Sequence, residues 1–353
     1  MADTHTQGSD STSITVLDLV KACDNFRLPA GHGSDVSNPD RLVPWSLTQS
    51  QDSPIVGLLK PEIIELLRTE ADDAWVIPNE HANYRVSFHA SIDTPSKRTN
   101  VMRQLCEKWR DSGTIYQDII GPKKWRNEMY PVYRNPFGVH RPYDPDGAED
   151  SDAGNYAFEM ERSACALFGV VTYGVHMTIY HEDTDGGNVR VWIPTRSRTK
   201  QTWPGYLDNS VAGGVPSGMS MFESLVKESM EEASIEEHII KTHAKCVGCI
   251  SYFYRTTRGW LQPEVEYVYD LRASPGIDTT PFQPKPLDGE VESFELLPLD
   301  QVVTKMRQGL FKANCAMVVV DFLIRHGYLT PDNEPDFLEI QTRLHGRFDY
   351  ERW

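Results

Sequence analysis

One segment of the sequence, between residues 213 and 235, limits what this chain can fold into more than any other. It opens with a glycine-rich stretch that contains Gly213, Gly214 and Gly218. Glycine adopts backbone conformations closed to other residues, so this stretch predicts a loop that comes close to a ligand. Ser220 and Glu223 then have the spacing of a capping box, which predicts that a helix begins at this point.

Three glutamates on this predicted helix, Glu228, Glu231 and Glu232, are spaced so that they share one face about one turn long. Like charges at this spacing repel by a few tenths of a kcal/mol per pair. A hard divalent cation such as Mg²⁺ reverses that cost, and it can neutralise a diphosphate and activate water. A solvated acidic face is the ordinary interpretation of such glutamates, but the glycine loop at fixed spacing favours a metal site.

The composition indicates a soluble globular protein. Of 353 residues, 39% are hydrophobic and 24% are charged, and the length favours two domains. The net charge of −16 argues against a general surface for nucleic acid or for an anionic membrane. An acidic chain that binds a phosphorylated small molecule therefore needs local basic residues and a metal ion.

Targeting signals and covalent cross-links are not evident. Residues 1–13 form a polar tail that we expect to be disordered, without the apolar core of a secretion signal. No apolar run reaches the roughly 20 residues that span a bilayer, so a cytoplasmic protein is expected. Six cysteines are too few for a disulfide framework. Cys246 and Cys249 form a single CxxC, which we interpret as buried thiols because two ligands do not complete a tetrahedral zinc site.

In the first part of the chain we expect an accessory domain over residues 14–150. Helical spacing covers Ile14–Phe26, with Ser13 as the N-cap, and Pro61 opens a helix over Glu62–Arg68. Alternation predicts a strand at residues 84–89, and an amphipathic helix follows at residues 96–112. A Pro-, Gly- and Asp-rich stretch at residues 135–155 predicts the domain boundary.

The second part, residues 151–345, has the pattern of an α+β domain. Strands are predicted at residues 167–180, 189–193, 246–254, 265–271 and 292–298. One helix follows the glycine-rich loop and another is expected at residues 313–326. A mixed sheet with flanking helices accounts for this order of elements.

The carboxylate segment resembles the Nudix box, Gly-x5-Glu-x7-Arg-Glu-x-x-Glu-Glu-x-Gly. Gly213 matches the opening glycine, and Glu228, Glu231 and Glu232 match the metal-binding glutamates. Three positions depart from the pattern: Met219, Lys227 and Ser234 stand where the box has Glu, Arg and Gly. Lysine lacks the planar bidentate geometry of arginine, so the substitution at Lys227 affects how the glutamates are oriented.

The flanking segments resemble one group within that family, the thiamine pyrophosphokinase-related Nudix proteins. The resemblance covers residues 161–169, 173–176, 192–209, 288–292 and 311–327, and more weakly the first part of the chain, including residues 125–128. It implies a Nudix fold, a mixed sheet sandwiched between helices, preceded by a smaller α/β domain. It also implies hydrolysis of thiamine diphosphate, oxothiamine diphosphate and oxythiamine diphosphate to monophosphates with Mg²⁺ or Mn²⁺. A homodimer is possible.

Further candidate residues surround the box. Arg196, Arg198 and Lys200 form a basic cluster that could receive a terminal phosphate, or could lie in a solvated loop. Glu290 is favoured as an additional metal ligand or general base; its rivals are Glu264, Glu266 and Glu292. Gly213 and Gly214 are expected beside the substrate. His176 is interpreted as a core histidine with its hydrogen bonds satisfied, and Trp203, Tyr252 and Phe253 either stack on a ring or pack in the core.

Specific positions in the sequence argue against two competing functions. The stretch from Lys200 to Ser210 also resembles isopentenyl diphosphate isomerase, but Ala212 and Gly214 stand where that enzyme has a cysteine and a histidine. A kinase is disfavoured because the chain has no GxxxxGK[ST] phosphate loop. A Nudix hydrolase of another nucleoside diphosphate derivative, of the ADP-ribose or NADH type, and a non-catalytic ligand-binding Nudix protein remain the alternatives.

Overall fold

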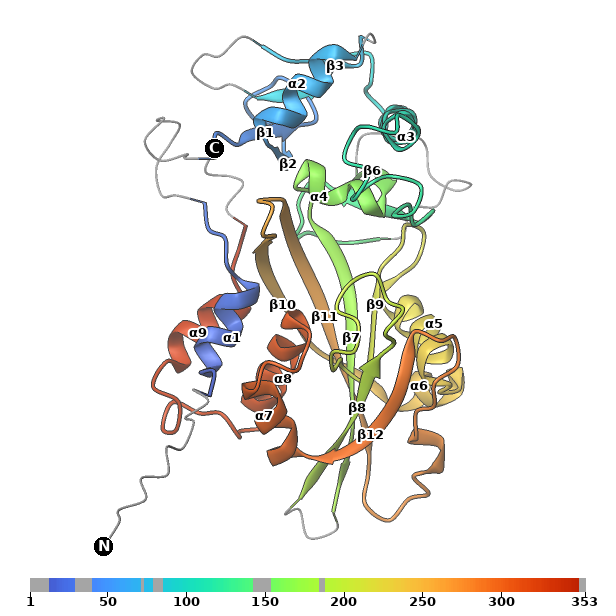
Figure 1. Ribbon diagram of the computed structural model, residues 1–353, viewed down its shortest axis with the longest axis vertical. Helices are drawn as coiled ribbons and strands as arrows, with labels where there is room; N and C mark the ends of the chain where they lie inside the picture. Colours follow the sequence, from blue (N-terminus) through green and yellow to red (C-terminus); the bar gives the residue numbers. More distant parts are fainter. Residues whose placement is uncertain are drawn as a thin grey trace, which may run out of the picture.

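A long mixed sheet runs through the larger lobe of the molecule in the computed structural model (Figure 1), which describes residues 13–28, 40–70, 73–78, 85–141, 154–183 and 188–348. The strand order is β10-β11-β7-β8-β12, and β9 pairs with β7. β11 runs parallel to β7 and the other pairs are antiparallel. The strands are β7 (Thr172–Glu182), β8 (Val189–Arg196), β9 (Val211–Gly214), β10 (Ala244–Arg255), β11 (Leu261–Ala273) and β12 (Val291–Pro298). The predicted α+β class is confirmed.

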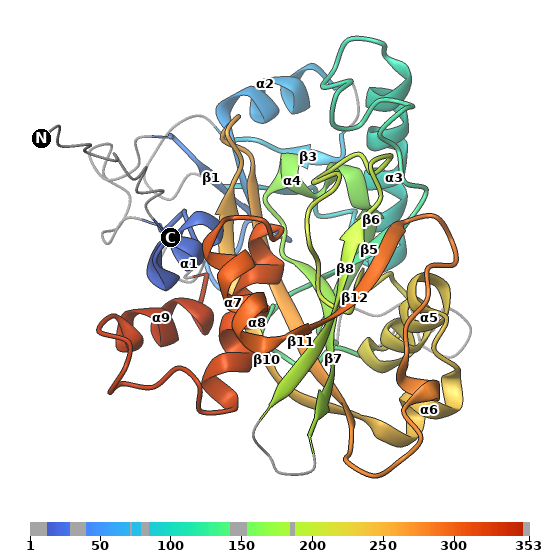
Figure 2. The ribbon, with the colours of Figure 1, turned by 60° about the horizontal axis from the view of Figure 1, so that its bottom comes forward.

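Helices cover both faces of this sheet (Figure 2). One side carries α1 (Val16–Cys23), α7 (Leu299–Arg307), α8 (Ala313–Arg325) and α9 (Phe337–Leu344), and the other carries α5 (Met221–Ala233) and α6 (Glu237–His243). Each side has its own buried apolar cluster, one including Val319 of α8 and the other Leu225 of α5. The predicted sandwich of a mixed sheet between helices is therefore present.

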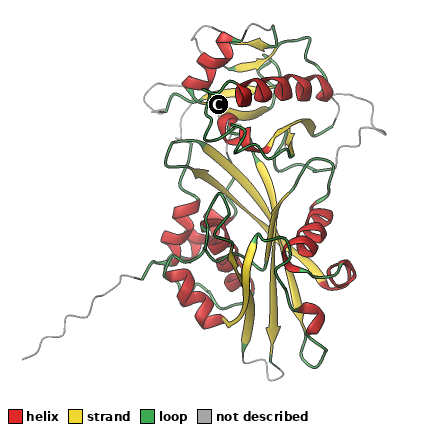
Figure 3. Cartoon of the chain, turned by 45° about the vertical axis from the view of Figure 1, so that its right-hand side comes forward, coloured by secondary structure: helices red, strands yellow, loops and turns green. Residues whose placement is uncertain are grey.

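A smaller lobe lies at one end of the sheet (Figure 3). We call it the accessory lobe and define it as the described residues from 40 to 141 together with residues 154–168. Its sheet has the order β2-β1-β4-β3, from β1 (Val43–Ser46), β2 (Ile55–Leu59), β3 (Trp75–Val76) and β4 (Val86–Phe88). The remaining elements are α2 (Pro61–Thr69), α3 (Pro95–Asp111), the pair β5 (Met129–Tyr133) and β6 (Tyr156–Glu161), the 3₁₀ turn η1 (Arg162–Ala164) and α4 (Cys165–Phe168).

Local sequence rules explain the helices of this lobe. Pro61 and Pro95 stand at the first turns of α2 and α3, where a missing N–H costs no hydrogen bond. Thr94 caps α3 by accepting a hydrogen bond from the backbone N–H of Lys97 at 3.4 Å. The helix buries Met102, Leu105, Cys106 and Trp109, and these fall on one face as helical periodicity requires. Both predicted helices are confirmed to within about a residue at each end.

Two expectations about element ends were wrong. Thr15, rather than Ser13, caps α1, because its side chain accepts from the backbone N–H of Asp18 at 3.1 Å, and the helix ends at Cys23. The strand expected from residue 167 begins at Thr172, since residues 165–168 form α4 and Gly169 reverses the chain at φ +57°. The strand predicted at residues 84–89 is present as β4 over residues 86–88, and Tyr84 lies outside the described residues.

The apolar clusters do not divide the chain in sequence order. Phe158 and Phe168, which follow the predicted boundary, surround Trp45 of β1 in the accessory lobe. The first helix, α1, packs instead against α8 and α9 of the larger lobe. Residues 142–153 of the predicted boundary lie outside the described residues, as does the tail up to residue 12, so domain limits at 14–150 and 151–345 remain a prediction.

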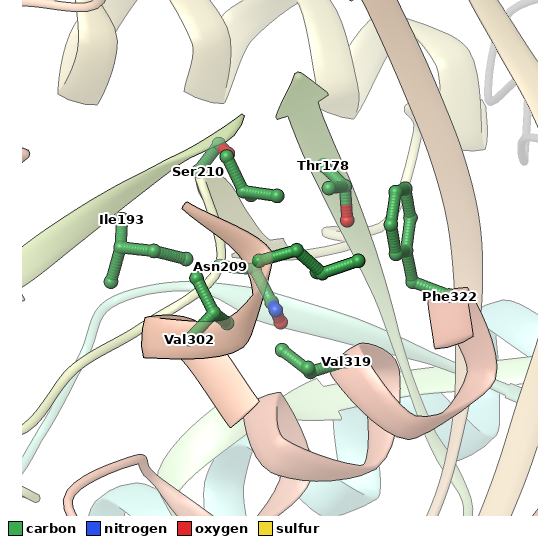
Figure 4. Close-up of a pocket in the computed structure, with 9 residues that line it drawn as sticks. Thr178, Ile193, Asn209, Ser210, Val302, Val319 and Phe322 are labelled. Carbon is green, nitrogen blue, oxygen red and sulfur yellow. The ribbon is translucent and has the colours of Figure 1, made fainter. Parts of the chain in front are cut away.

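Beneath α7 and α8 the core of the larger lobe contains a void of about 10 Å³ (Figure 4). Apolar side chains such as Ile193, Val302 and Phe322 line most of it, beside Thr178 and Asn209. A space of this size holds at most one water molecule, so it is a packing feature and not a ligand site. In the described part of the chain, every helix is too short or too polar to span a bilayer.

Candidate active site

The helix predicted after the glycine-rich stretch is α5, and its capping box is present. Ser220 Oγ accepts from the backbone N–H of Glu223 at 3.2 Å, and the Glu223 carboxylate accepts from the Ser220 N–H at 2.8 Å. The helix ends at Ser234, which has a left-handed conformation with φ +54°. This is the position at which the Nudix box has glycine, and the geometry explains that preference because a side chain is strained there.

Gly213 and Gly214 differ from expectation: they belong to the short strand β9 and not to a loop. Their role is close packing. A β-carbon built on Gly213 would lie less than 3.0 Å from Glu228 Cγ, and one on Gly214 would meet the hydroxyl of Tyr130. Glycine is needed at these positions because α5 and β5 approach the backbone of β9 directly. Of the three glycines in this segment, Gly218, in the turn before α5, is the one with a positive φ, at +86°.

The three candidate metal ligands have different environments. The Glu232 residue is 8% exposed and the Glu228 side chain 15% exposed, whereas the Glu231 side chain is 53% exposed. The Lys227 ammonium lies 3.1 Å from Glu228 Oε1 and 2.9 Å from Glu231 Oε2. Lys227 therefore contacts two of the glutamates from the position at which the Nudix box has arginine.

A cavity of about 500 Å³ lies between α5, the end of the sheet and the accessory lobe. Most of the candidate residues predicted from the sequence line it: Arg196, Lys200, Gly213, Gly214, Glu228, Glu232 and Glu290. Glu231 and Arg198 are not among its lining residues. Arg198 is exposed and its Nε lies 3.5 Å from Glu292. The structure thus brings together residues that are nearly one hundred positions apart.

Burial governs the charge state of the carboxyl groups in this cavity. Loss of solvent raises the pKa of Glu228, an effect that the neighbouring Lys227 only partly offsets. The pKa of Glu232 lies well above its usual range because of burial and the nearby charges of Asp208 and Glu228. A hydrogen bond between the carboxyl groups of Glu232 and Glu290 contributes to the same shift. Clustered carboxyl groups with this repulsion favour a divalent cation among them.

Arg196 is held mainly by its own loop. Its guanidinium donates to Asp208 at 2.5 Å, to the Trp203 carbonyl at 3.1 Å and to the Thr202 carbonyl at 3.1 Å. These hydrogen bonds hold the segment between β8 and β9 against Arg196, the last residue of β8. The pKa of Asp208 is lowered to about 2, because Lys312 and Arg196 outweigh the effect of its burial.

Glu290, the favoured candidate for an additional metal ligand or general base, lines the cavity and lies beside Glu232. Lys200 pairs with Glu290, and this ion pair lowers the pKa of Glu290 in spite of burial. Glu264 and Glu266 line the same cavity from β11. Glu292 is paired with Arg198, away from the cavity.

The wall formed by β10 and β11 is the part of the site that the sequence predicted least well. Tyr252 donates to Glu264, and its hydroxyl lies 2.9 Å from Glu266 Oε1. Asn314 donates to the same oxygen at 3.2 Å. Burial and the charge of Glu266 raise the pKa of Glu264, whereas His176 lowers that of Glu266 to about 2 despite its burial. Glu264 and Glu266 are two residues apart on one strand and so share a face, and this spacing is the local feature of the sequence that could have indicated the wall.

A glycine row crosses the floor between this wall and α5. Glu266 of β11 pairs with Gly174 of β7, and Gly174 pairs with Gly214 of β9. A β-carbon on Gly174 would collide with the Glu266 carboxylate. Since neighbouring strands are about 4.8 Å apart, the row spans about 10 Å. Glu266 thus stands at one end of this row, and Glu228 packs beside the other end, on Gly213.

His176 fits the interpretation as a satisfied core histidine. It is 3% exposed, its Nδ1 lies 2.7 Å from Asn209 Oδ1 and its Nε2 lies 3.5 Å from Glu266 Oε1. It also forms a buried group with Asp208 and Cys315, whose polar atoms all lie within 4.8 Å of one another. Of the proposed stacking residues, Trp203 and Tyr252 line the cavity, whereas Phe253 packs in the core against Phe26.

The interpretation of Cys246 and Cys249 as buried thiols was wrong. Both are exposed, because the edge strand β10 has a bulge between Cys246 and Gly248 and the first half of the strand faces solvent. The other four cysteines, Cys23, Cys106, Cys165 and Cys315, are buried and free.

The residues of the site suit a hard divalent cation. Oxygen ligands are available from Glu228 and Glu232, with Glu231 one turn away, and Gly213 leaves room for the Glu228 side chain. The two cysteines that line the cavity, Cys23 of α1 and Cys165 of α4, belong to other elements than α5.

Comparison with known proteins agrees with this geometry. The NUDIX domain model matches residues 172–315, and a domain of unknown function, DUF4743, matches residues 19–140. The Saccharomyces cerevisiae uncharacterized protein YJR142W is 40% identical over 263 residues, which cover 72% of this chain and 69% of that protein. Nudix hydrolase 20, chloroplastic, of Arabidopsis thaliana is 35% identical over 298 residues, 83% of this chain and 71% of that protein.

Among solved structures, DR0079 from Deinococcus radiodurans is 24% identical, with a TM-score of 0.31, over 42% of this chain and 82% of that one. The sequence relatives and the domain match establish the family. The chain belongs to the Nudix hydrolases, enzymes that cleave diphosphate linkages and generally use divalent metals such as Mg²⁺ or Mn²⁺.

Proposed function

We propose that this protein hydrolyses thiamine diphosphate and its oxidised analogues, oxothiamine diphosphate and oxythiamine diphosphate, to the monophosphates. The observation that carries the proposal is the glycine-floored cavity, which has carboxylates of α5 at one end and a tyrosine–glutamate wall at the other. A substrate with a diphosphate at one end and a polar heterocycle at the other matches this division. The resemblance of residues 161–327 to the thiamine-related group supports the same choice.

Glu228, Glu231 and Glu232 are proposed to hold Mg²⁺ or Mn²⁺. When bound, such an ion neutralises the diphosphate and lowers the pKa of a water molecule. The buried position of Glu232 and the packing of Glu228 against Gly213 restrict the directions in which their oxygens point. This restriction orients the carboxylates before the substrate binds.

Glu290 is proposed to take the proton from the attacking water. Its carboxyl group is hydrogen-bonded to that of Glu232, and Lys200 stabilises its ionised form. An ionised carboxylate beside the metal-binding group is suited to act as a general base. Arg196 holds the loop between β8 and β9 in place and is assigned a positioning role, and Lys200 is assigned to the Glu290 carboxylate with which it pairs.

The heterocycle is proposed to lie against Tyr252, with Glu264 and Glu266 beside it. An aminopyrimidine has both N–H donors and ring-nitrogen acceptors. A carboxyl group with a raised pKa next to an ionised one offers both kinds of partner, as Glu264 and Glu266 do. Tyr254 and Trp260 add aromatic surface to the same wall.

A substrate panel tests the proposal. Full-length protein with Mg²⁺ is incubated with thiamine diphosphate, oxothiamine diphosphate, oxythiamine diphosphate, ADP-ribose and NADH, and the products are quantified by chromatography. We expect a thiamine compound to have the highest kcat/KM. A kcat/KM for ADP-ribose or NADH that is tenfold higher than for all three thiamine compounds would instead assign the enzyme to nucleoside diphosphate derivatives.

A further inference from the structure

Three cations of the larger lobe near α5 are already paired, and a fourth that lines the cavity, Lys312, lies within the field of the Asp208 and Glu264 charges. Arg196 is bonded to Asp208, and Lys200 is paired with Glu290. Lys227 contacts Glu228 and Glu231. These side chains neutralise local carboxylates, so they leave little positive charge for the phosphate groups of a substrate in a chain of net charge −16.

Three further cations line the cavity from the accessory lobe, and one of them, Arg162, is paired with Glu128. The other two, Lys124 and Arg126, belong to the loop between α3 and β5. In the parts of the chain that the structure describes, neither side chain has a hydrogen-bond, ion-pair or cation–π partner. The nearby Asp118 pairs with Arg258, and the Trp125 ring is covered by Arg110. Lys124 is partly buried and Arg126 is exposed at the edge of this cavity. Since no ion pair among the described residues neutralises them, they form a local site for an anion in an acidic protein.

This loop is fixed in position, which distinguishes it from an arbitrary surface loop. The buried Glu161 carboxylate accepts from the backbone N–H of Arg126 at 2.8 Å and of Glu128 at 3.3 Å. Two bonds then tie the loop to the larger lobe. Gln201 donates to the Lys123 carbonyl at 3.1 Å, and the Ser217 N–H donates to the Met129 carbonyl at 2.8 Å.

The loop ends directly over the glycine pair. Tyr130 is buried, and its hydroxyl occupies the space that a β-carbon of Gly214 would fill. Gly214 is adjacent to Gly213, on which Glu228 packs. The accessory lobe therefore forms one side of the same compartment as the metal-binding glutamates.

We propose that Lys124 and Arg126 of the accessory lobe form a subsite for the phosphate groups of the substrate, so that the active site is completed by both lobes. The subsite rests on the proposed function, since it assumes that the substrate carries a diphosphate. It gives the segment matched by DUF4743 a direct role in binding. Arg126 can donate two parallel hydrogen bonds to phosphate oxygens, and Lys124 adds a point charge.

The binding test uses inorganic pyrophosphate and the full chain in EDTA, so that no metal contributes. Isothermal titration compares wild type with Lys124→Gln, Arg126→Gln and the double variant. Matched controls are Lys123→Gln, an exposed neighbour that does not line the cavity, and Arg103→Gln on the outside of α3. We expect each cavity substitution to weaken binding about tenfold and the controls to leave it within about twofold. Equal affinity of the double variant and wild type would overturn the subsite.

A kinetic test separates this proposal from that for the substrate. With Mg²⁺ and thiamine diphosphate, Arg126→Gln is expected to raise KM about tenfold with a smaller change in kcat, and Arg126→Lys is expected to recover part of the loss. Hydrolysis of thiamine diphosphate with unchanged KM in the variants would refute the subsite and leave the proposed function intact. Loss of pyrophosphate binding in the variants of a protein that hydrolyses no thiamine compound would refute the substrate and leave the subsite intact.

Discussion

Gly213 and Glu228 are in such close contact that a β-carbon on the glycine would lie less than 3.0 Å from two carbon atoms of the glutamate side chain. The strand β9 and the helix α5 thereby fix the direction of a carboxylate proposed to bind the metal. Glycine is needed at position 213 because the Glu228 side chain fills the space of a β-carbon. An unusual backbone angle is not the reason, since the φ of Gly213 is not positive.

Gly213→Ala is therefore expected to displace Glu228 and to reduce kcat by up to about 100-fold, the order of loss produced by a misplacement of about 1 Å. The variant should remain folded. Steady-state kinetics with Mg²⁺ and thermal unfolding measure the two effects. Gly218→Ala is the comparison, because open space surrounds Gly218 but its φ is +86°. It should cost about 1 kcal/mol of stability and little activity. Wild-type kinetics for Gly213→Ala would show that the contact does not position Glu228.

The part of the site around α5 could be predicted because its rules are local. The capping box of Ser220 and Glu223 and the helical spacing of the glutamates depend on a few neighbouring residues. The opposite wall depends on strand register, which brings Glu266 beside Gly174 through the parallel pairing of β11 with β7. Nothing local in the sequence specifies that pairing, so Glu264 and Glu266 were considered only as rivals of Glu290.

The contribution of the accessory lobe to the cavity could not be predicted from local sequence rules either. Tyr130, Lys124 and Arg126 reach the cavity because Glu161 and Ser217, from later in the chain, hold their loop. The same limitation explains the error over Cys246 and Cys249. Their apolar surroundings in the sequence predicted burial, but β10 is an edge strand with a bulge at that point.

The exposure of these cysteines gives a simple prediction. Of the six thiols, Cys246 and Cys249 should react with Ellman's reagent in the native protein, and the other four only after unfolding. Burial also raises the pKa values of Cys23, Cys106, Cys165 and Cys315, which slows their reaction further. A Cys246→Ser, Cys249→Ser double variant should show no rapid phase. Rapid reaction of more than two thiols in wild type would contradict the structure.

The charge on Asp208 should make stability pH-dependent. Its pKa is about 2 in the folded protein and about 3.9 in an unfolded chain. A carboxyl with a depressed pKa stabilises the fold above its unfolded pKa and loses that contribution as the pH falls through its folded pKa. The window is therefore about pH 4 to pH 2, with about half of the loss complete near pH 3.

Urea unfolding of wild type and Asp208→Asn measures this contribution. The difference in unfolding free energy between the two proteins should narrow by about 1 kcal/mol between pH 5 and pH 3. Asp332→Asn, which changes an exposed carboxylate, is the control and should show no such change. A difference that stays constant over this range would mean that Asp208 is not held ionised by Arg196 and Lys312.

The capping box should contribute to the stability of α5. Ser220→Ala removes the acceptor for the Glu223 N–H and is expected to cost about 1 kcal/mol, whereas Ser220→Asp keeps an acceptor and should cost less. Chemical unfolding of the two variants gives both values. Equal stability of Ser220→Ala and wild type would indicate that this hydrogen bond is replaced by water without loss.

The glutamates of α5 are proposed to hold the divalent metal that cleavage of the diphosphate requires. The most direct test is turnover of the preferred diphosphate substrate by Glu232→Gln at saturating Mg²⁺, with folding checked by circular dichroism. The substitution keeps the size of the side chain and removes its charge. We expect kcat to fall at least about 100-fold, in line with the loss of a group that orders the charged reaction centre. A folded Glu232→Gln protein with wild-type kcat would contradict the assignment of the site.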